Sequence, residues 1–331
     1  MKKLVVLSAL FTFACGLSAA PPKNKVHIAL IVQDTVDDKG WCQSMYDAIK
    51  SVQKTYGPSL VDFSYSEKMK PVDAGSAARQ YAAKHFDIII CHGAQYKNTI
   101  LEMANDFPGT TFVFGTSADI GPKNVFTYMP ESEQTGYLNG IIAGMVTKSK
   151  IVGLVGPVDG GDAARYDRGF WLGAKSVDPK IDVKVAHTGS FSDFVKAGEL
   201  AQTEMQAGAD FLTGSSQQAL GALGAVAKNK DKAVWWAGQD TAQLTIPNSF
   251  KVIAAASYDY VPVVEELIAK REAGVKGGEC IPLTFGNKGF TYKFNDNVGP
   301  VLTKAIRTKV EKVKADLTSG KLVLAWKEVK Y

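Results

Sequence analysis

The chain has 331 residues, of which 46% are hydrophobic, and a formal net charge of +5 at pH 7. Because this length exceeds what a single hydrophobic core usually serves, we expect two domains of ordinary size. The positive charge is concentrated in residues 293–331, which carry nine lysines or arginines against four acidic residues. Basic and aromatic residues are not interleaved there, so the segment indicates a solvated helix face and argues against a nucleic-acid-binding protein.

The first 20 residues have the pattern of a secretory signal peptide. Two lysines precede an apolar run that is too short to span a bilayer, and small residues follow before Pro21. We therefore expect an exported, periplasmic protein that is released by cleavage near Ala19 or Ala20. The alternative is lipid attachment at Cys15, which would make the protein a membrane-anchored lipoprotein. Phe13 fits a lipobox poorly, so we expect the protein to partition into the aqueous phase.

A strand, an acidic turn and a helix follow this segment. Residues 26–32 form a short, β-branched apolar run that is typical of a parallel strand covered on both faces. From Trp41 onward, apolar residues recur at helical spacing. Ligands of open α/β sheets bind at the carboxyl ends of the strands. The turn, with Asp34, Asp37 and Asp38, is therefore the first place where we expect a ligand.

The alternation of strands and helices continues along the chain. In the first half we expect strands at 60–65, 87–91, 111–115 and 125–128 and helices at 72–84 and 98–106. In the second half we expect helices at 136–148, 163–177, 194–207, 217–227, 261–271 and 298–317, and strands at 151–156, 183–187, 211–213, 234–237, 252–256, 281–285 and 290–294.

No low-complexity linker separates the two halves, so we expect several short crossings between the domains. The polar stretch 130–135 is the first of them. We assign residues 21–128 to an N-terminal lobe, with about 258–290 returning to it. Residues 129–257 form a C-terminal lobe, with about 291–331 completing it.

No catalytic or metal-binding pattern stands out. The sequence has no nucleophile elbow, no phosphate-binding loop and no dinucleotide-binding glycine pattern after a strand. The four histidines lack ligand spacing, so we expect no metal and no cofactor. Without the signal segment three cysteines remain, and of these Cys91, in an apolar strand, is expected to be a core residue. Gly221 and Gly224 lie inside a predicted helix, where they indicate close packing. The sequence therefore favours a binding protein over an enzyme.

The candidate ligand residues share one location, the carboxyl ends of the predicted strands. They combine aromatic rings with carboxylates, amides and hydroxyls, which suits a flat ring that bears a polyol. From the first lobe they are Asp37, Asp38, Trp41, Gln43, His92, Gly93 and Tyr96, with Asp34, Thr116 and Ser117 nearby. From the rest of the chain they are Tyr166, Phe170, Ser215, Gln217, Asp240 and Lys288, with Ser216, Gln239 and Asn287 nearby.

Structural roles stay open for several of these residues. Asp37 or Asp38 can serve only to cap the helix. Phe170 can be a core residue, and Trp41 can pack between the lobes. For Trp41 the two interpretations differ in what its truncation changes, which is ligand affinity in one case and stability in the other.

Three segments, in order, resemble signatures of the basic membrane protein family of ABC-transporter solute-binding lipoproteins, which includes purine nucleoside receptors. Residues 37–42, DDKGWC, resemble N-D-K-S-F-N. Residues 136–148, GYLNGIIAGMVTK, resemble A-Y-L-A-G-I-L-A-G-x-x-T-K, and residues 166–173, YDRGFWLG, resemble F-x-x-G-F-x-x-G. The resemblance covers almost the whole mature chain.

This resemblance implies a type I periplasmic-binding-protein fold, with two doubly wound α/β lobes of parallel sheet joined by short hinge crossings. It also implies a nucleoside held between aromatic rings, here Trp41 and Phe170, with Asp38 and Asp240 as polar contacts. Trp41 and Cys42 stand where the family usually has phenylalanine and asparagine. Because tryptophan offers a larger surface, riboflavin is an alternative ligand.

The leading hypothesis is an extracytoplasmic receptor that closes on a nucleoside-like or flavin solute and delivers it to the membrane subunits of an ABC importer. The alternatives are an exported enzyme that processes nucleosides and a ligand-sensing module that feeds a receptor. The enzyme would need a base or nucleophile that the sequence does not offer.

Overall fold

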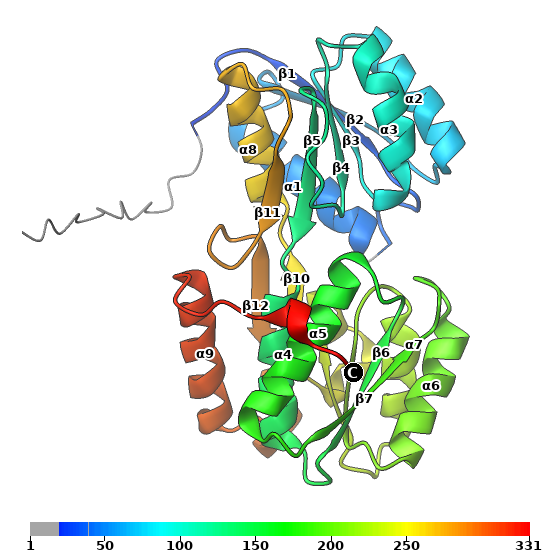
Figure 1. The fold of residues 1–331 in the computed structure, drawn as a ribbon, viewed down its shortest axis with the longest axis vertical. Coiled ribbons are helices and arrows are strands. Elements are labelled where there is room, and N and C mark those ends of the chain that lie inside the picture. The colour runs from blue at the N-terminus through cyan, green and yellow to red at the C-terminus, as the bar shows by residue number, and fades with distance from the viewer. Residues whose placement is uncertain (1–19, 39) are drawn as a thin grey trace, which may run out of the picture.

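The computed structural model describes residues 20–38 and 40–331 and has two α/β lobes stacked along its long axis (Figure 1). The predicted signal segment, including Cys15, lies outside the described residues, apart from Ala20. Each lobe contains one six-stranded sheet with helices packed against it. The two-lobed, doubly wound architecture predicted from the sequence is therefore confirmed.

The N-terminal lobe has the strand order β11-β5-β4-β3-β1-β2, and all of its paired strands are parallel. Its strands are β1 (Val26–Ile31), β2 (Val61–Ser66), β3 (Ile88–Cys91), β4 (Thr111–Gly115), β5 (Val125–Pro130) and β11 (Cys280–Leu283). Its helices are α1 (Trp41–Tyr56), α2 (Pro71–Ala83), α3 (Lys97–Met103) and α8 (Val261–Glu272), which packs against α1. Cys91 is buried in β3, as predicted.

The C-terminal lobe has the strand order β12-β10-β9-β8-β6-β7. Its strands are β6 (Ile151–Gly156), β7 (Asp182–His187), β8 (Phe211–Gly214), β9 (Trp235–Gly238), β10 (Val252–Tyr258) and β12 (Phe290–Phe294). Its helices are α4 (Glu133–Val146), α5 (Gly161–Val177), α6 (Phe194–Gln206), α7 (Ala219–Lys228) and α9 (Lys304–Thr318), which packs against α4.

Three short connections join the lobes, at residues 131–132, 259–260 and 284–289. The last of them leads directly from β11 in one sheet to β12 in the other without a helix. A chain that runs straight on from the carboxyl edge of one sheet enters the opposing sheet against the direction of its strands. This explains why β12 pairs antiparallel with β10 in an otherwise parallel sheet.

The predicted terminal helix 298–317 is wrong at its start. Residues Asp296–Val301 form a separate 3-10 helix, and α9 begins only at Lys304. Gly299 has a φ of 67°, and Pro300 has no N–H to donate, so the α-helix cannot extend through them. The Thr303 side chain then accepts a hydrogen bond from the Ile306 N–H and caps the new helix.

Helices α4 and α5 hold the second and third family-like segments, and they touch backbone to backbone. A Cβ placed on Gly140 would lie 2.1 Å from the Phe170 carbonyl oxygen, and one on Gly173 would lie 2.1 Å from that of Tyr137. The glycines are therefore required for close packing of the two helices. This contact joins the two segments inside the C-terminal lobe.

Candidate functional site between the lobes

The carboxyl ends of the two parallel sheets face each other where the lobes meet. Gln217, which follows β8, donates from Nε2 to Oδ2 of Asp38, which follows β1, over 3.3 Å. A Cβ placed on Gly161, at the start of α5, would lie 3.2 Å from the Thr116 hydroxyl oxygen. The lobes are thus in direct contact at the edge where ligands of such sheets bind.

Asp38 fixes the start of α1. Its Oδ1 accepts hydrogen bonds from the backbone N–H groups of Gly40 (2.9 Å) and Gln43 (3.0 Å), and its Oδ2 accepts one from that of Cys42 (3.0 Å). These are among the N–H groups that a helix leaves unpaired in its first turn. Asp38 therefore does cap the helix, and it also bonds to the opposite lobe. Its neighbour Asp37 is exposed.

Trp41 is the first residue of α1 and is held by His92 at the end of β3. The two rings stack with centroids 4.3 Å apart and planes 14° apart. Trp41 Nε1 donates to the His92 carbonyl oxygen (3.2 Å), and His92 Nε2 bonds to the Trp41 carbonyl oxygen (2.9 Å). Because that nitrogen must donate, His92 Nδ1 accepts from the Tyr128 hydroxyl at 2.5 Å.

Burial lowers the pKa of His92 to about 3, so its imidazole is neutral at physiological pH. A neutral ring with both nitrogens engaged forms a fixed support for Trp41. One face of the indole is covered by this support.

Two tyrosines flank the same indole. Tyr258, the last residue of β10, lies edge to face with Trp41 at 5.5 Å, and Tyr260 does so at 5.8 Å. The Tyr258 hydroxyl donates to Asp162 Oδ2 in the first turn of α5 (2.6 Å) and accepts from Gln239 Nε2 (2.7 Å). Sequence reasoning missed Tyr258 and Asp162, whereas Tyr260 is fully buried and packs against the indole from inside the protein. The aromatic pair directly after an apolar strand, and an aspartate in a first helical turn, were the available signals.

Three carboxylates, Asp38, Asp162 and Asp240, lie in this region. Burial and the charge of Asp38 raise the pKa of Asp240 to about 6, although the Ala242 N–H donates to it. Burial also raises the pKa of Asp162, against the opposing effect of hydrogen bonds from Tyr258 and Thr116. None of the three forms an ion pair with a lysine or arginine of the described chain.

The described residues contain no group of three or more His, Cys, Asp or Glu side chains that could hold a metal ion. The side chains gathered between the lobes are aromatic rings, carboxylates and the amide of Gln217.

Several predicted ligand residues are not brought to this interlobe surface. Phe170 and Tyr166 are fully buried in the C-terminal lobe, where the Tyr166 hydroxyl accepts from Asn139 (2.8 Å) and bonds to Thr213. Tyr96 is fully buried under α2 and α3 and donates to the Met69 carbonyl oxygen. Tyr166 and Phe170 lie more than one turn into α5, where it packs against α4, and Tyr96 lies directly before α3 with its side chain turned into the core of the N-terminal lobe.

The remaining predicted residues take different positions. Gln43 is half-buried in the first turn of α1, and Gly93 is buried directly after His92. Ser215 is buried at the end of β8, and its hydroxyl has no partner among the described residues. Lys288 is exposed on the connection between β11 and β12, and none of the interlobe contacts above involves it.

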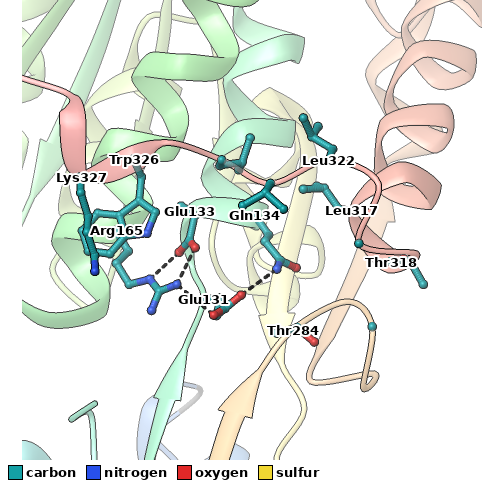
Figure 2. Close-up of a pocket in the computed structure, with 14 residues that line it drawn as sticks. Glu131, Glu133, Gln134, Arg165, Thr284, Leu317, Thr318, Leu322, Trp326 and Lys327 are labelled. Carbon is teal, nitrogen blue, oxygen red and sulfur yellow. Dashed lines mark hydrogen bonds and ion pairs between the residues drawn. The ribbon is translucent and has the colours of Figure 1, made fainter. Parts of the chain in front are cut away.

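A separate pocket of about 490 Å³ lies on the hinge side of the molecule (Figure 2). Arg165 of α5 bonds there to both oxygens of Glu133 and to Glu131 in the first connection, while its guanidinium lies 4.9 Å from the Trp326 ring. Gln134 donates to Glu131 and accepts from the Phe285 N–H in the third connection. None of the predicted ligand residues lines this pocket. Its contacts instead tie two of the connections to the C-terminal lobe.

Two α/β lobes, three short connections and a polar, aromatic surface between facing sheet edges define a two-domain solute-binding protein. A family model described as "ABC transporter substrate-binding protein PnrA-like" matches residues 25–299, and the chain belongs to this family, Bmp. It is thus a substrate-binding component of an ABC transporter. The family resemblance noted in the sequence is confirmed. No helix of the described residues has both the length and the apolar character needed to cross a membrane.

Relatives and solved structures agree with this assignment. The chain is 24% identical over 318 residues to an ABC transporter nucleoside-binding protein of Lactococcus lactis, covering 89% of this chain and 88% of that protein. It is 24% identical over 209 residues to a purine-binding protein of Brucella abortus, covering 63% of this chain and 59% of that one. A solute-binding protein of an ABC transporter from Conexibacter woesei superposes with a TM-score of 0.74 at 25% identity, covering 90% of this chain and 98% of that one.

Proposed function

We propose that this chain binds an uncharged solute with a flat heteroaromatic ring and several hydrogen-bond donors, and that a purine nucleoside or nucleobase is the first candidate. The observation that carries the proposal is the surface between the lobes, where Trp41 lies among three carboxylates that have no basic partner in the described chain. The names of the Lactococcus and Brucella relatives support the same solute class.

The chemistry of the site limits the solute. Carboxylates accept hydrogen bonds from the hydroxyl groups of a sugar and from ring N–H groups. They repel a phosphate, because like charges a few ångströms apart interact unfavourably by several kcal/mol in a partly buried site. We therefore expect nucleosides to bind and nucleotides to be rejected. His92 covers one face of Trp41, so the solute ring stacks on the other face.

Riboflavin is the second candidate. Its ring system is wider than a purine and its ribityl chain is also rich in hydroxyls, and the large indole of Trp41 favours it. Both solutes are uncharged, so the carboxylates accept either.

We further propose that the protein acts outside the cytoplasm, where it closes on its solute and presents it to the membrane subunits of the importer. The predicted signal segment supports export, whereas a lipid on Cys15 would keep the protein at the membrane. Detergent partitioning of the native protein and of Cys15→Ala distinguishes these forms. We expect both in the aqueous phase, and a shift caused by the substitution would show that Cys15 is acylated.

A thermal-shift panel tests the solute class. Nucleosides, their 5′-monophosphates, nucleobases, riboflavin and sugars are each added to the purified protein. A solute at about a hundred times its dissociation constant stabilises the folded state by ~2.7 kcal/mol, which raises the melting temperature by several degrees. We expect this shift with a nucleoside, a nucleobase or riboflavin. A response only to sugars, or only to phosphorylated compounds, would contradict the proposal.

A further inference from the structure

Tyr258 lies where the three connections between the lobes meet. It ends β10 immediately before the second connection. Its ring lies 5.9 Å from that of Phe290, which follows the third connection, and its hydroxyl lies 3.3 Å from the Ser132 Oγ in the first connection. A rotation of one lobe against the other therefore changes the surroundings of this side chain first.

The Tyr258 side chain also touches both lobes. Its ring lies against Trp41 of the N-terminal lobe, with the planes at 85°. Its hydroxyl donates to Asp162 and accepts from Gln239, both in the C-terminal lobe. Since the only phenolic hydrogen goes to the carboxylate, the Ser132 hydroxyl must donate. The hydroxyl is thus fully engaged, and it fixes the angle at which the ring meets Trp41.

Asp162 is also placed at the junction. The neighbouring Gly161 approaches the Thr116 hydroxyl of the N-terminal lobe so closely that a Cβ there would lie 3.2 Å away. A hydrogen bond from Thr116 contributes to the environment of the Asp162 carboxyl. Trp41, Tyr258, Asp162 and Thr116 therefore form a continuous chain of contacts that starts and ends in the N-terminal lobe.

Tyr260 provides a natural comparison two residues further on. Its ring also lies edge to face with Trp41, and the side chain is fully buried. Its hydroxyl, however, has no hydrogen-bond partner among the described residues. The two tyrosines share the ring contact with Trp41 and differ in whether the hydroxyl is bonded to the C-terminal lobe.

We propose that Tyr258 is a positioning residue that couples the Trp41 surface to closure of the lobes through its hydrogen bond to Asp162. The inference rests on the proposed function, because it takes Trp41 as the contact with the solute. Without the hydroxyl, the Tyr258 ring is free to turn, and the arrangement in which the lobes touch is less populated. A solute that binds only when the lobes touch then has a lower apparent affinity, in proportion to the fall in the fraction of molecules with touching lobes.

The first experiment measures lobe closure without any solute. Spin labels on Val72→Cys in α2 and Val195→Cys in α6, in a Cys280→Ser background, report the distance between two exposed positions on different lobes. We expect Tyr258→Phe to lengthen and broaden this distance, and Tyr260→Phe to leave it as in the wild type. Equal distances in all three proteins, or the same change in both variants, would overturn the proposal.

The second experiment measures the affinity of the same variants for adenosine as the probe. The lost hydrogen bond is to a carboxylate, so Tyr258→Phe should weaken binding by about tenfold, with Tyr260→Phe within about twofold of the wild type. Asp162→Asn and the double variant with both substitutions complete a double-mutant cycle. We expect the double variant to bind adenosine only slightly more weakly than Tyr258→Phe alone. Additive losses would overturn the coupling. Failure of the wild type to bind adenosine would count against a purine nucleoside as the solute, while the label distances would still decide the role of Tyr258.

Discussion

The turn between β1 and α1 in the N-terminal lobe and the turn between β6 and α5 in the C-terminal lobe follow one plan but present different residues. In the first turn, Asp38 caps the helix, and Trp41, as the first helical residue, reaches the opposite lobe. In the second, Gly160 precedes the helix without a side-chain cap, and Asp162 rather than an aromatic residue reaches the junction. The aromatic residues Tyr166 and Phe170 of α5 come later and are buried.

The difference shows that depth along the helix decides the role of a side chain. Residues of the first turn lie at the carboxyl edge of the sheet, where the other lobe is within reach. Tyr166 and Phe170 lie one to two turns further along, where α5 meets α4. A repeated pattern of strand, turn and helix in the sequence therefore predicts the same scaffold in both lobes. The residues that the two lobes present to the solute need not be equivalent.

The largest effect is expected from Phe170→Ala. Truncation of a fully buried phenylalanine leaves a cavity and should lower the free energy of unfolding by ~3–5 kcal/mol. The affinity of the remaining folded protein for the solute should stay within about twofold. Urea unfolding and calorimetric titration of the same sample measure both quantities. An unchanged free energy of unfolding together with a large loss of solute affinity would show that Phe170 contacts the solute.

The C-terminal lobe carries a second feature that the described residues of the N-terminal lobe lack, a glutamate buried against β6. Both oxygens of Glu204 are unpartnered among the described residues, next to Gly153, and burial raises its pKa from 4.5 to about 9. Because the folded state holds the proton more tightly, its stabilising contribution is complete below pH 4.5 and is lost as the pH rises toward 9.

We therefore expect the unfolding free energy of the wild type to fall by up to ~1.4 kcal/mol per pH unit across this range from Glu204 alone. Glu204→Gln should flatten the profile, and urea unfolding at several pH values measures it. Parallel profiles for the two proteins would show that Glu204 is not buried as an acid.

Trp41→Ala should act on binding more than on folding. Loss of a stacked base costs ~1–3 kcal/mol, which corresponds to a roughly five- to 150-fold weaker affinity. Because Trp41 is only half-buried, its truncation should destabilise the protein less than Phe170→Ala does. The matched control is Trp171→Ala on α5, where the indole contacts Lys175, and it should leave affinity unchanged. A large loss of stability at unchanged affinity would make Trp41 a core residue.

The smallest effect concerns the cap. Asp38→Ala removes the acceptor for the N–H groups of Gly40, which precedes α1, and of Cys42 and Gln43 in its first turn, and should lower stability by ~0.5–2 kcal/mol. It should also weaken solute binding, since it removes one carboxylate from the surface between the lobes. The neighbouring Asp37→Ala, at an exposed position, should change neither quantity. Thermal unfolding and titration compare the pair, and equal effects of both substitutions would contradict the assignment.

Local sequence signals predicted the scaffold well. The start of α1 at Trp41 and the bounds of β4 agree with the expected ones, because apolar periodicity and turn residues are local. The sequence also placed Asp38, Trp41, Gln217 and Asp240 at sheet edges, where the structure gathers them. The pairing of α4 with α5 and the convergence of the connections on Tyr258 are tertiary contacts. These contacts depend on how elements far apart in the sequence pack in the folded protein, and local residue spacing does not predict that packing.

Calorimetric titration of the mature protein with a nucleoside and with its 5′-monophosphate tests most directly whether the carboxylates and Trp41 between the lobes hold an uncharged ring-bearing solute. The two compounds share the ring and the sugar and differ in charge. We expect the nucleoside to bind and the monophosphate to bind at least about tenfold more weakly, as repulsion by Asp38, Asp162 and Asp240 requires. Tighter binding of the monophosphate would contradict the account.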